Sequence, residues 1–258
     1  MTNVQSVERI SAILNMVASQ QEGAGVTEVA QQVKLPISTV SRFLLALERV
    51  DFVERVSDSS RFRIGAAIFD LATRADFAQY LIKMARPCLL ELAQATGETT
   101  TLTILKNGKV YCIDQVSGQY NLQLQDWTGQ YFPLHTSADG KIYLAFMPQK
   151  ALNDYLSQAL IKVTPHSITD PDRLREQLKE VRRTGYAWTQ DEYEQGLIAL
   201  ASPIRGTNGQ VVAAVGLGAP TFRLPADHER DQIIQQVIDS ANRLTAQLQK
   251  NKININPS

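Results

Sequence analysis

The sequence predicts an α+β protein in which two domains are joined by a helix. Two observations support this fold class: three short helical repeats and a hairpin occupy the first 66 residues, and two further hairpins alternate with amphipathic helices after residue 95. The chain has 258 residues, of which 44% are hydrophobic, and this is enough for two hydrophobic cores. We expect a first domain at 1–66, a linker helix region at 67–95, a second domain at 96–250 and a disordered tail at 251–258.

The composition leaves the class of partner open. Lys and Arg number 26 together, as do Asp and Glu, so the net charge of zero neither indicates nor excludes nucleic acid. No apolar stretch approaches the ~18 residues of a membrane span, and the N-terminus does not resemble a signal peptide. We therefore expect a cytoplasmic protein without membrane partners. Cys88 and Cys112 are too far apart for a metal or redox pair, and both should be buried small hydrophobic residues.

Two helices open the first domain. Ser6 is expected to cap the first, which glycines end after Val17. The second begins at Val26 and ends before Pro36, which closes it after barely two turns. The apolar residues of the first helix that repeat at helical spacing are Val7, Ile10, Leu14 and Val17.

The third helix has two chemically different sides. Its predicted core stripe consists of Ile37, Val40, Leu44 and Leu47. Ser38, Thr39 and Arg42 fall on the opposite side, within one turn of each other. A short helix, a tight turn and a longer helix form the helix-turn-helix plan, in which the second helix enters the major groove. Hydroxyl groups can approach phosphates closely and an arginine can hold a guanine edge, so this side is typical of DNA recognition.

A hairpin follows the third helix and completes a winged helix-turn-helix. Apolar residues alternate around the turn-forming "SDSS", and Arg55, Arg61 and Arg63 give it a basic rim. No acidic residue occurs between Val29 and Leu47, so the potential there is locally positive. The alternative is an ordinary three-helix core with solvated polar residues. The candidate DNA-binding residues are Thr27, Lys34, Ser38, Thr39, Ser41, Arg42, Arg61 and Arg63.

The remaining elements follow from helical repeats, caps and turn residues. The linker region has a helical repeat that Pro87 should kink or restart. Hairpins turn at Asn107-Gly108 and Asn208-Gly209, and "NLQLQDWTG" is expected as a strand on which Leu122 and Leu124 share a face. Three more helices are expected: the first begins after Thr136-Ser137, the second ends at Gly185, and the third runs from about Ala226 to Leu248. Together they predict a mixed or antiparallel sheet flanked by helices.

The whole chain resembles the IclR family of bacterial transcription regulators. The resemblance lies in "VERISAILNMV", "LPISTVSRFLLALERVDFVER" and "RFRIG", and further along in "FPLHTSADGKIYLA", "TGYAWTQDEYEQGLIALASPI" and "GQVVAAVGLGAP". It spans roughly Val4 to Gln249 in the family's order and spacing. It implies a GAF-like effector-binding second domain, dimers or tetramers, and a pseudo-palindromic double-stranded DNA operator.

The resemblance also implies where a small-molecule effector binds. In the family, a helix start, the apolar strand before it and the strands after the Gly-Tyr element line the pocket. The amides at such a helix start also suit an anion. The corresponding candidate effector-binding residues are Leu122, Leu124, Ser137, Ala138, Asp139, Thr189, Ala199, Gly216 and Gly218.

This sequence departs from the members of the family that bind small acids. Several of them carry an acidic residue at the place of Thr189, a cysteine at that of Ala199, and serines at those of Gly216 and Gly218. Without these polar groups the pocket has fewer hydrogen-bond donors and more free volume. This favours a bulkier organic acid, aromatic acids included, or a related metabolite as the effector. Asp139 would repel an anion, so we expect it to face solvent.

Two other classes of function compete with this interpretation. A winged helix can serve protein contacts or dimerisation alone. His135, Asp139 and Lys141 lie close together, as acid–base catalysis would require, yet no catalytic motif accompanies them. We expect no enzymatic activity, cofactor or metal. We interpret His135 as a structural histidine and Lys141 as a solvated helix residue.

Overall fold

The computed structural model describes residues 5–57, 59–74, 77–223 and 227–251 of the chain. The chain divides into two compact units, Met1–Phe77 and Ala78–Ser258. Of the predicted disordered tail, all but Asn251 lies outside the described residues.

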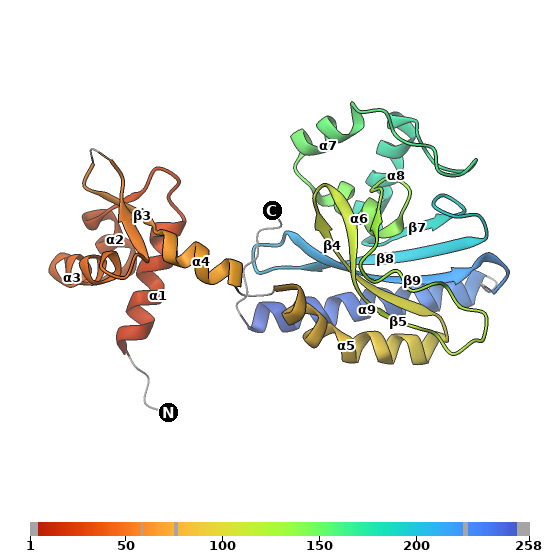
Figure 1. Ribbon diagram of the computed structural model, residues 1–258, viewed down its shortest axis with the longest axis horizontal. Coiled ribbons are helices and arrows are strands. Elements are labelled where there is room, and N and C mark those ends of the chain that lie inside the picture. Colours follow the sequence, from red (N-terminus) through yellow and green to blue (C-terminus); the bar gives the residue numbers. More distant parts are fainter. Residues whose placement is uncertain (1–4, 58, 75–76, 224–226, 252–258) are drawn as a thin grey trace. The chain divides into compact units, whose positions relative to one another are not determined.

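The first unit is a three-helix core with a small antiparallel sheet (Figure 1). Strand order in the sheet is β1-β3-β2, so the predicted hairpin is flanked by one more short strand. The core gathers Ile13 and Val17 of the first helix with apolar residues of the next two. The elements are α1 (Gln5–Ala18), β1 (Ala24–Gly25), α2 (Val26–Val33), α3 (Ile37–Glu48), β2 (Val53–Arg55), β3 (Arg61–Ile64) and α4 (Ala66–Arg74).

Two details of these helices differ from the prediction. Helix α1 already includes Gln5, so Ser6 lies inside its first turn and is not its cap. Ile37, the first residue of α3, is 54% exposed and does not belong to the core stripe of that helix. The rest of that stripe, Val40, Leu44 and Leu47, is buried as predicted.

The predicted linker region contains two helices. The first is α4, and the second is α5 (Phe77–Thr96), which continues through Pro87 without ending there. One side of α5 is buried in the second unit, where Arg243 of the last helix donates to Glu91 at 2.8 Å. Most of the stretch expected to be a linker is therefore a packed helix of the second unit.

The second unit is built on a six-stranded sheet in the order β6-β5-β4-β9-β8-β7, and every pairing among the described strands is antiparallel. Both predicted hairpins are confirmed, and the first turns at Asn107 and Gly108, which both have positive φ. The strands are β4 (Thr99–Lys106), β5 (Lys109–Val116), β6 (Tyr131–Phe132), β7 (Ala187–Gln190), β8 (Leu197–Arg205) and β9 (Val211–Pro220).

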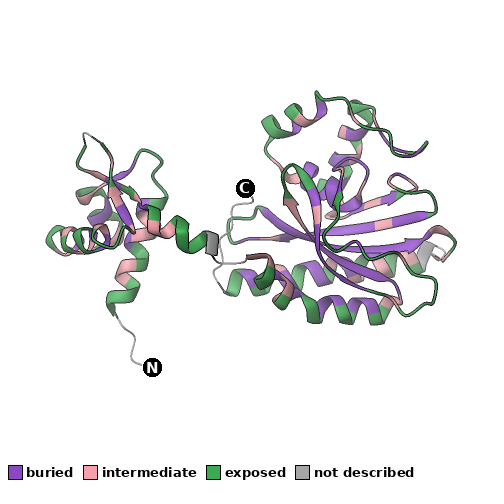
Figure 2. Ribbon diagram, viewed as in Figure 1, coloured by how far each residue is buried: buried purple, intermediate pink, exposed green. Residues whose placement is uncertain are grey.

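Helices cover both faces of this sheet. Helices α5 and α9 (Asp227–Lys250) lie against one face and α6 (Ala138–Phe146) against the other, with α8 (Pro171–Thr184) packed on α6 (Figure 1). The central strands are buried along most of their length, whereas α5 and α9 are buried on one side (Figure 2). Two predicted caps of this unit are confirmed: Ser137 Oγ accepts from Gly140 N, and Gly185 ends α8 in the left-handed region.

The predicted strand in "NLQLQDWTG" is wrong, because residues 121–129 form bends, turns and irregular structure. Because no strand forms there, Leu122 and Leu124 do not share the face of a strand as predicted. Helix α7 (Gln149–Leu156) and the short strand β6 were not predicted.

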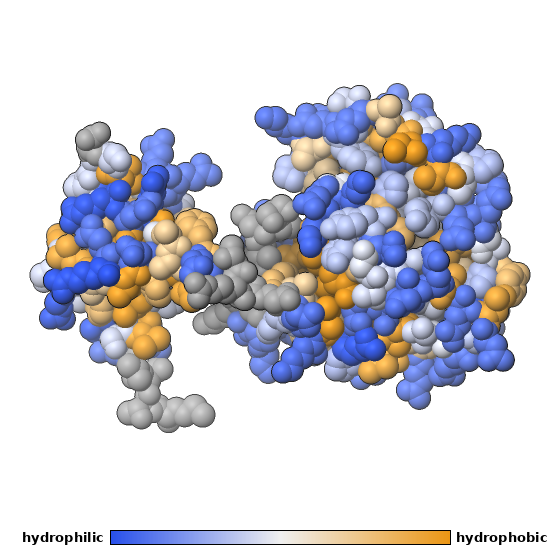
Figure 3. All heavy atoms as spheres, viewed as in Figure 1, coloured by the Kyte–Doolittle hydropathy of each residue, from blue (hydrophilic) through white to orange (hydrophobic). Residues whose placement is uncertain are grey.

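No helix among the described residues is long and apolar enough to cross a membrane. In the space-filling view, hydrophilic residues cover most of the visible face of the second unit, with scattered hydrophobic residues between them (Figure 3).

Candidate functional site

Helices α2 and α3 meet at the tight turn that a helix-turn-helix requires. Lys34 closes α2 in the left-handed conformation, with φ of 54°, and Pro36 directly precedes α3. Ala30 is buried where the two helices cross. No side chain caps the start of α3. The first turn of α3 is therefore open to an outside acceptor such as a phosphate.

The outward side of α3 carries the predicted polar residues. Ser38 and Arg42 are exposed, and Thr39 and Ser41 are partly buried. Among the described residues, no carboxylate forms an ion pair with Lys34 or Arg42. These two cations therefore keep their charge available for a polyanion.

The arginines of the wing are already engaged within the unit. Arg61 binds both carboxylate oxygens of Glu28, at 3.1 and 2.8 Å, and donates to the carbonyl of Gly23. Arg63 pairs with Glu54 at 2.6 Å. The same Glu28 accepts from Gly25 N at the start of α2. Arg61 thus fastens the wing to α2, and the rim of the wing is less positive than its arginines suggest.

A pocket lies between the start of α6 and the strands of the large sheet. Five of the candidate effector residues line it together: Ser137, Asp139, Thr189, Ala199 and Gly218. The space open to the centres of water molecules is about 40 Å³, enough for only a few of them.

The other four candidates do not line this pocket. Leu122 is 61% exposed, and its carbonyl accepts from Arg223. Leu124 packs on the core beside Gly218, while Ala138 is fully buried in that core. Gly216 lies behind Asp139, and a Cβ there would be 3.0 Å from Asp139 Oδ1.

Asp139 contradicts the prediction that it faces solvent. It is 9% exposed and lines the pocket, because α6 lies between the strands and α8, and every residue of its first turn is buried. Thr103 Oγ1 donates to its carboxylate at 2.9 Å. Burial nevertheless raises the pKa of Asp139 to about 6, since the hydrogen bond from Thr103 offsets only part of the lost hydration.

Aromatic residues on irregular segments supply much of the pocket wall. The ring of Phe132 stacks edge-to-face on Trp127 and on Tyr193, with centroids 5.6 and 5.0 Å apart. No periodicity could have indicated them, because Trp127 and Tyr193 lie outside the helices and strands.

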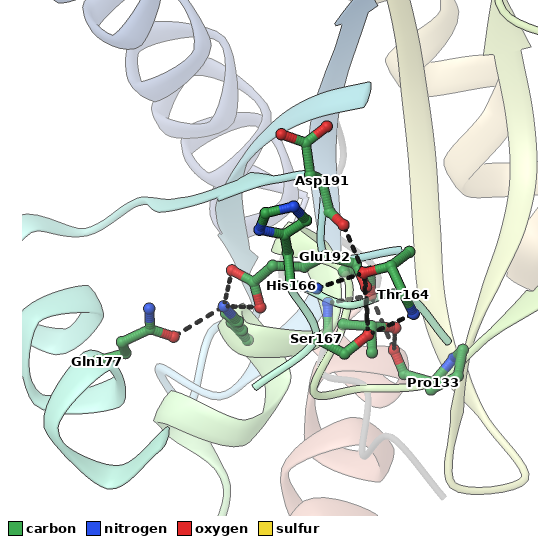
Figure 4. A network of polar contacts seen from close by, with 11 residues as sticks. Pro133, Thr164, His166, Ser167, Gln177, Asp191 and Glu192 are labelled. Atoms are coloured by element: carbon green, nitrogen blue, oxygen red, sulfur yellow. Dashed lines mark hydrogen bonds and ion pairs between the residues drawn. The ribbon is translucent and has the colours of Figure 1, made fainter. Parts of the chain in front are cut away.

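A buried ion pair supports the pocket from behind. Lys141 Nζ lies 2.6 and 2.7 Å from the carboxylate oxygens of Glu192 and 2.8 Å from Gln177 Oε1. Thr164 and Ser167 donate to the backbone carbonyl of Glu192 (Figure 4). The network joins α6 and α8 to the segment that carries Tyr193.

Lys141 is therefore not a solvated residue as predicted, since it is only 1% exposed. Burial lowers its pKa, and the neighbouring Glu192 partly reverses that change. His135 is the structural histidine that was expected: its ring nitrogens lie 2.8 Å from Tyr155 OH and 2.8 Å from the carbonyl of Ile161. Both cysteines are buried, also as predicted.

The chain matches two family models in adjacent parts of the sequence. Residues 6–57 match the IclR helix-turn-helix domain, and residues 77–246 match the bacterial transcriptional regulator IclR C-terminal domain.

Individual relatives cover most of both chains. The HTH-type transcriptional regulator KdgR of Dickeya chrysanthemi is 31% identical over 90% of this chain and 76% of its own length. The transcriptional repressor IclR of Escherichia coli is 28% identical over 94% of this chain and 89% of its own. An IclR transcriptional regulator of Alicyclobacillus acidocaldarius is structurally similar, with a TM-score of 0.62 and 26% identity over 95% of this chain and 99% of that one. The chain belongs to the IclR family of bacterial transcriptional regulators.

Proposed function

We propose that this chain binds a pseudo-palindromic DNA operator as a homodimer or tetramer in the cytoplasm and is switched by a small organic metabolite. Its family membership makes it a ligand-responsive, DNA-binding transcriptional regulator. One observation carries the DNA-binding assignment: Ser38 and Arg42 project from α3 opposite its buried side, and no described carboxylate neutralises Arg42. This arrangement suits a helix that lies in the major groove.

The competing functions have less support. A winged helix used only for protein contacts would not need unpaired cations and hydroxyls gathered on one helix face. We also infer that the chain is not an enzyme, because His135 is held by two partners and burial raises the pKa of Cys112 to about 12. A thiol with such a pKa stays protonated and is a poor nucleophile at neutral pH.

The proposed switch is a shift between populations. Two copies of α3 would reach successive major grooves, and effector binding would favour arrangements that match or mismatch the half-site spacing. The expectation of an organic acid, aromatic acids included, or of a related catabolic metabolite stays a prediction. Whether the switch represses or activates depends on where the operator lies in the promoter.

We expect replacement of Arg42 by Ala to weaken specific DNA binding about 5- to 150-fold, the loss of about 1–3 kcal/mol that follows removal of a bidentate base contact. The measurement is a gel shift with operator sequences that the wild-type protein selects from a randomised DNA library. Arg49→Ala is the matched control, because it removes the same charge from the far end of α3. Undiminished binding by Arg42→Ala, or an equal loss with both variants, would argue against α3 as the recognition helix.

Arg61 and Arg63 are expected to behave differently from each other. Arg63→Ala breaks an exposed pair and should change little besides the salt dependence of DNA binding. Arg61→Ala should also loosen the wing, because Gly23 O loses its hydrogen bond from Arg61 and Glu28 keeps only the one from Gly25 N. Thermal unfolding of both variants, measured beside the gel shift, separates a lost DNA contact from a loosened wing.

A further inference from the structure

The charges around the effector pocket are unusual for a site that would receive an acid. Among the described residues that line it, Asp139 is the one carboxylate, and no Lys, Arg or His side chain is present. Asp139 also lies in the first turn of α6, where its negative charge offsets the positive end of the helix dipole. A carboxylate ligand would therefore meet a like charge without a compensating cation.

Trp127 provides a second, independent observation. Its side chain lines the same pocket and the residue is 8% exposed, yet its indole Nε1 has no hydrogen-bond partner. A buried N–H without an acceptor is costly, and native structures contain few of them. A ligand oxygen at the edge of the indole ring would satisfy it.

We infer that the effector is an uncharged, hydroxyl-bearing carbonyl compound, whose hydroxyl donates to Asp139 and whose carbonyl oxygen accepts from the indole of Trp127. An ionised Asp139 can only accept hydrogen bonds, so it selects a donor and rejects a second anion. The indole can only donate, so it selects an oxygen acceptor. This inference rests on the proposed function, because it specifies the ligand of the same pocket.

Gly216 supports the role of Asp139. A side chain at 216 would enter the space of both Asp139 and Thr101, since a Cβ there would be 2.4 Å from Thr101 Oγ1. The absence of a side chain at 216 is thus what allows the carboxylate to occupy the pocket wall. In this pocket, position 216 on β9 has no side chain, and the polar group at this place is the carboxylate of Asp139 on α6.

Four small probes separate the hydroxyl from the charge. Methyl lactate carries a hydroxyl where methyl pyruvate carries a ketone, and lactate and pyruvate repeat that difference with a negative charge. Calorimetry on the full chain at pH 7.5 should give the hydroxy ester at least tenfold tighter binding than the keto ester and the hydroxy acid. Binding of the acids as tight as that of the hydroxy ester would overturn the inference, as would a lack of binding by the hydroxy ester.

Three variants identify the groups responsible. In Asp139→Asn, the preference for hydroxyl over ketone should fall toward one and the acids should gain on the esters, because the amide both donates and accepts. Trp127→Phe should weaken hydroxy and keto esters by the same factor, since both share the carbonyl acceptor. Asp126→Asn removes an exposed carboxylate next to Trp127 in the sequence and should leave all preferences unchanged. An unchanged preference in Asp139→Asn would contradict the assignment.

A gel shift with the selected operator distinguishes this inference from the proposed function. Hydroxy esters that bind with the expected preferences but leave DNA retention unchanged would support the pocket assignment and count against the proposed switch. Acids that alter DNA retention while the hydroxy esters do not would support the switch and overturn the inference.

Discussion

Lys141→Met is expected to lower the free energy of unfolding of the second unit by about 3–5 kcal/mol. Lys141 and Glu192 are 1% and 8% exposed at their side chains, so removal of the ammonium leaves a buried carboxylate without its cation. Both tryptophans of the chain, Trp127 and Trp188, lie in the second unit, so urea unfolding followed by tryptophan fluorescence reports on this unit.

The double variant Lys141→Met/Glu192→Leu tests the cause. It should recover most of the lost free energy, because two apolar side chains of similar size replace the pair and no buried charge remains. Lys179→Met is the matched control: Lys179 pairs with Glu176 on the same unit, but both side chains are more than half exposed, and the change should stay within about 1 kcal/mol. A loss as large in the double variant as in the single one would show that the packing of Lys141, rather than its charge, stabilises the unit.

Asp139→Asn is expected to raise the free energy of unfolding of the second unit by about 2–3 kcal/mol at pH 7.5. Burial raises the pKa of Asp139 from 3.8 to about 6, and each pKa unit corresponds to about 1.4 kcal/mol. Because folding favours the protonated form, the stabilising contribution of Asp139 is complete below pH 3.8 and is lost as the pH rises through about 6. The advantage of Asn should therefore shrink as the pH falls from 7.5 to 4.

Urea unfolding at a series of pH values measures this difference directly. The titratable groups that interact with Asp139 are Cys112 on β5 and Tyr143 on α6, and burial raises the pKa of both, so they stay uncharged over this range. An advantage of Asn that does not vary with pH would show that Asp139 is not the titrating group. If Asp139→Asn is more stable and has an altered ligand preference, the charge of Asp139 lowers the free energy of unfolding but serves ligand recognition.

The parts of the fold that local chemistry decides could be predicted from the sequence. Asn107-Gly108 adopts the positive φ values that a two-residue hairpin requires, and Ser137 and Gly185 cap helices through groups they carry themselves. The exposed polar side of α3 also follows from helical spacing alone. In each case the deciding interaction is at most a few residues away.

The interior of the pocket could not be predicted, because it depends on contacts between distant segments. Helix α6 is buried on all sides, so helical spacing cannot distinguish Asp139 and Lys141 from ordinary surface residues. Lys141 finds its partner 51 residues further along the chain, at Glu192. Trp127 reaches the pocket from a segment without regular structure, and alternation there predicted a strand that does not exist.

Gly216 has a consequence for how ligand preference can diverge among descendants of this protein. A serine at 216 would place its Cβ 2.4 Å from Thr101 Oγ1 and 3.0 Å from Asp139 Oδ1, so both side chains would have to shift. A smaller residue at 139 would relieve one of these contacts, and it would also remove the carboxylate on which the inferred discrimination depends. We therefore expect substitutions at 139 and 216 to be coupled when the ligand preference of this pocket changes.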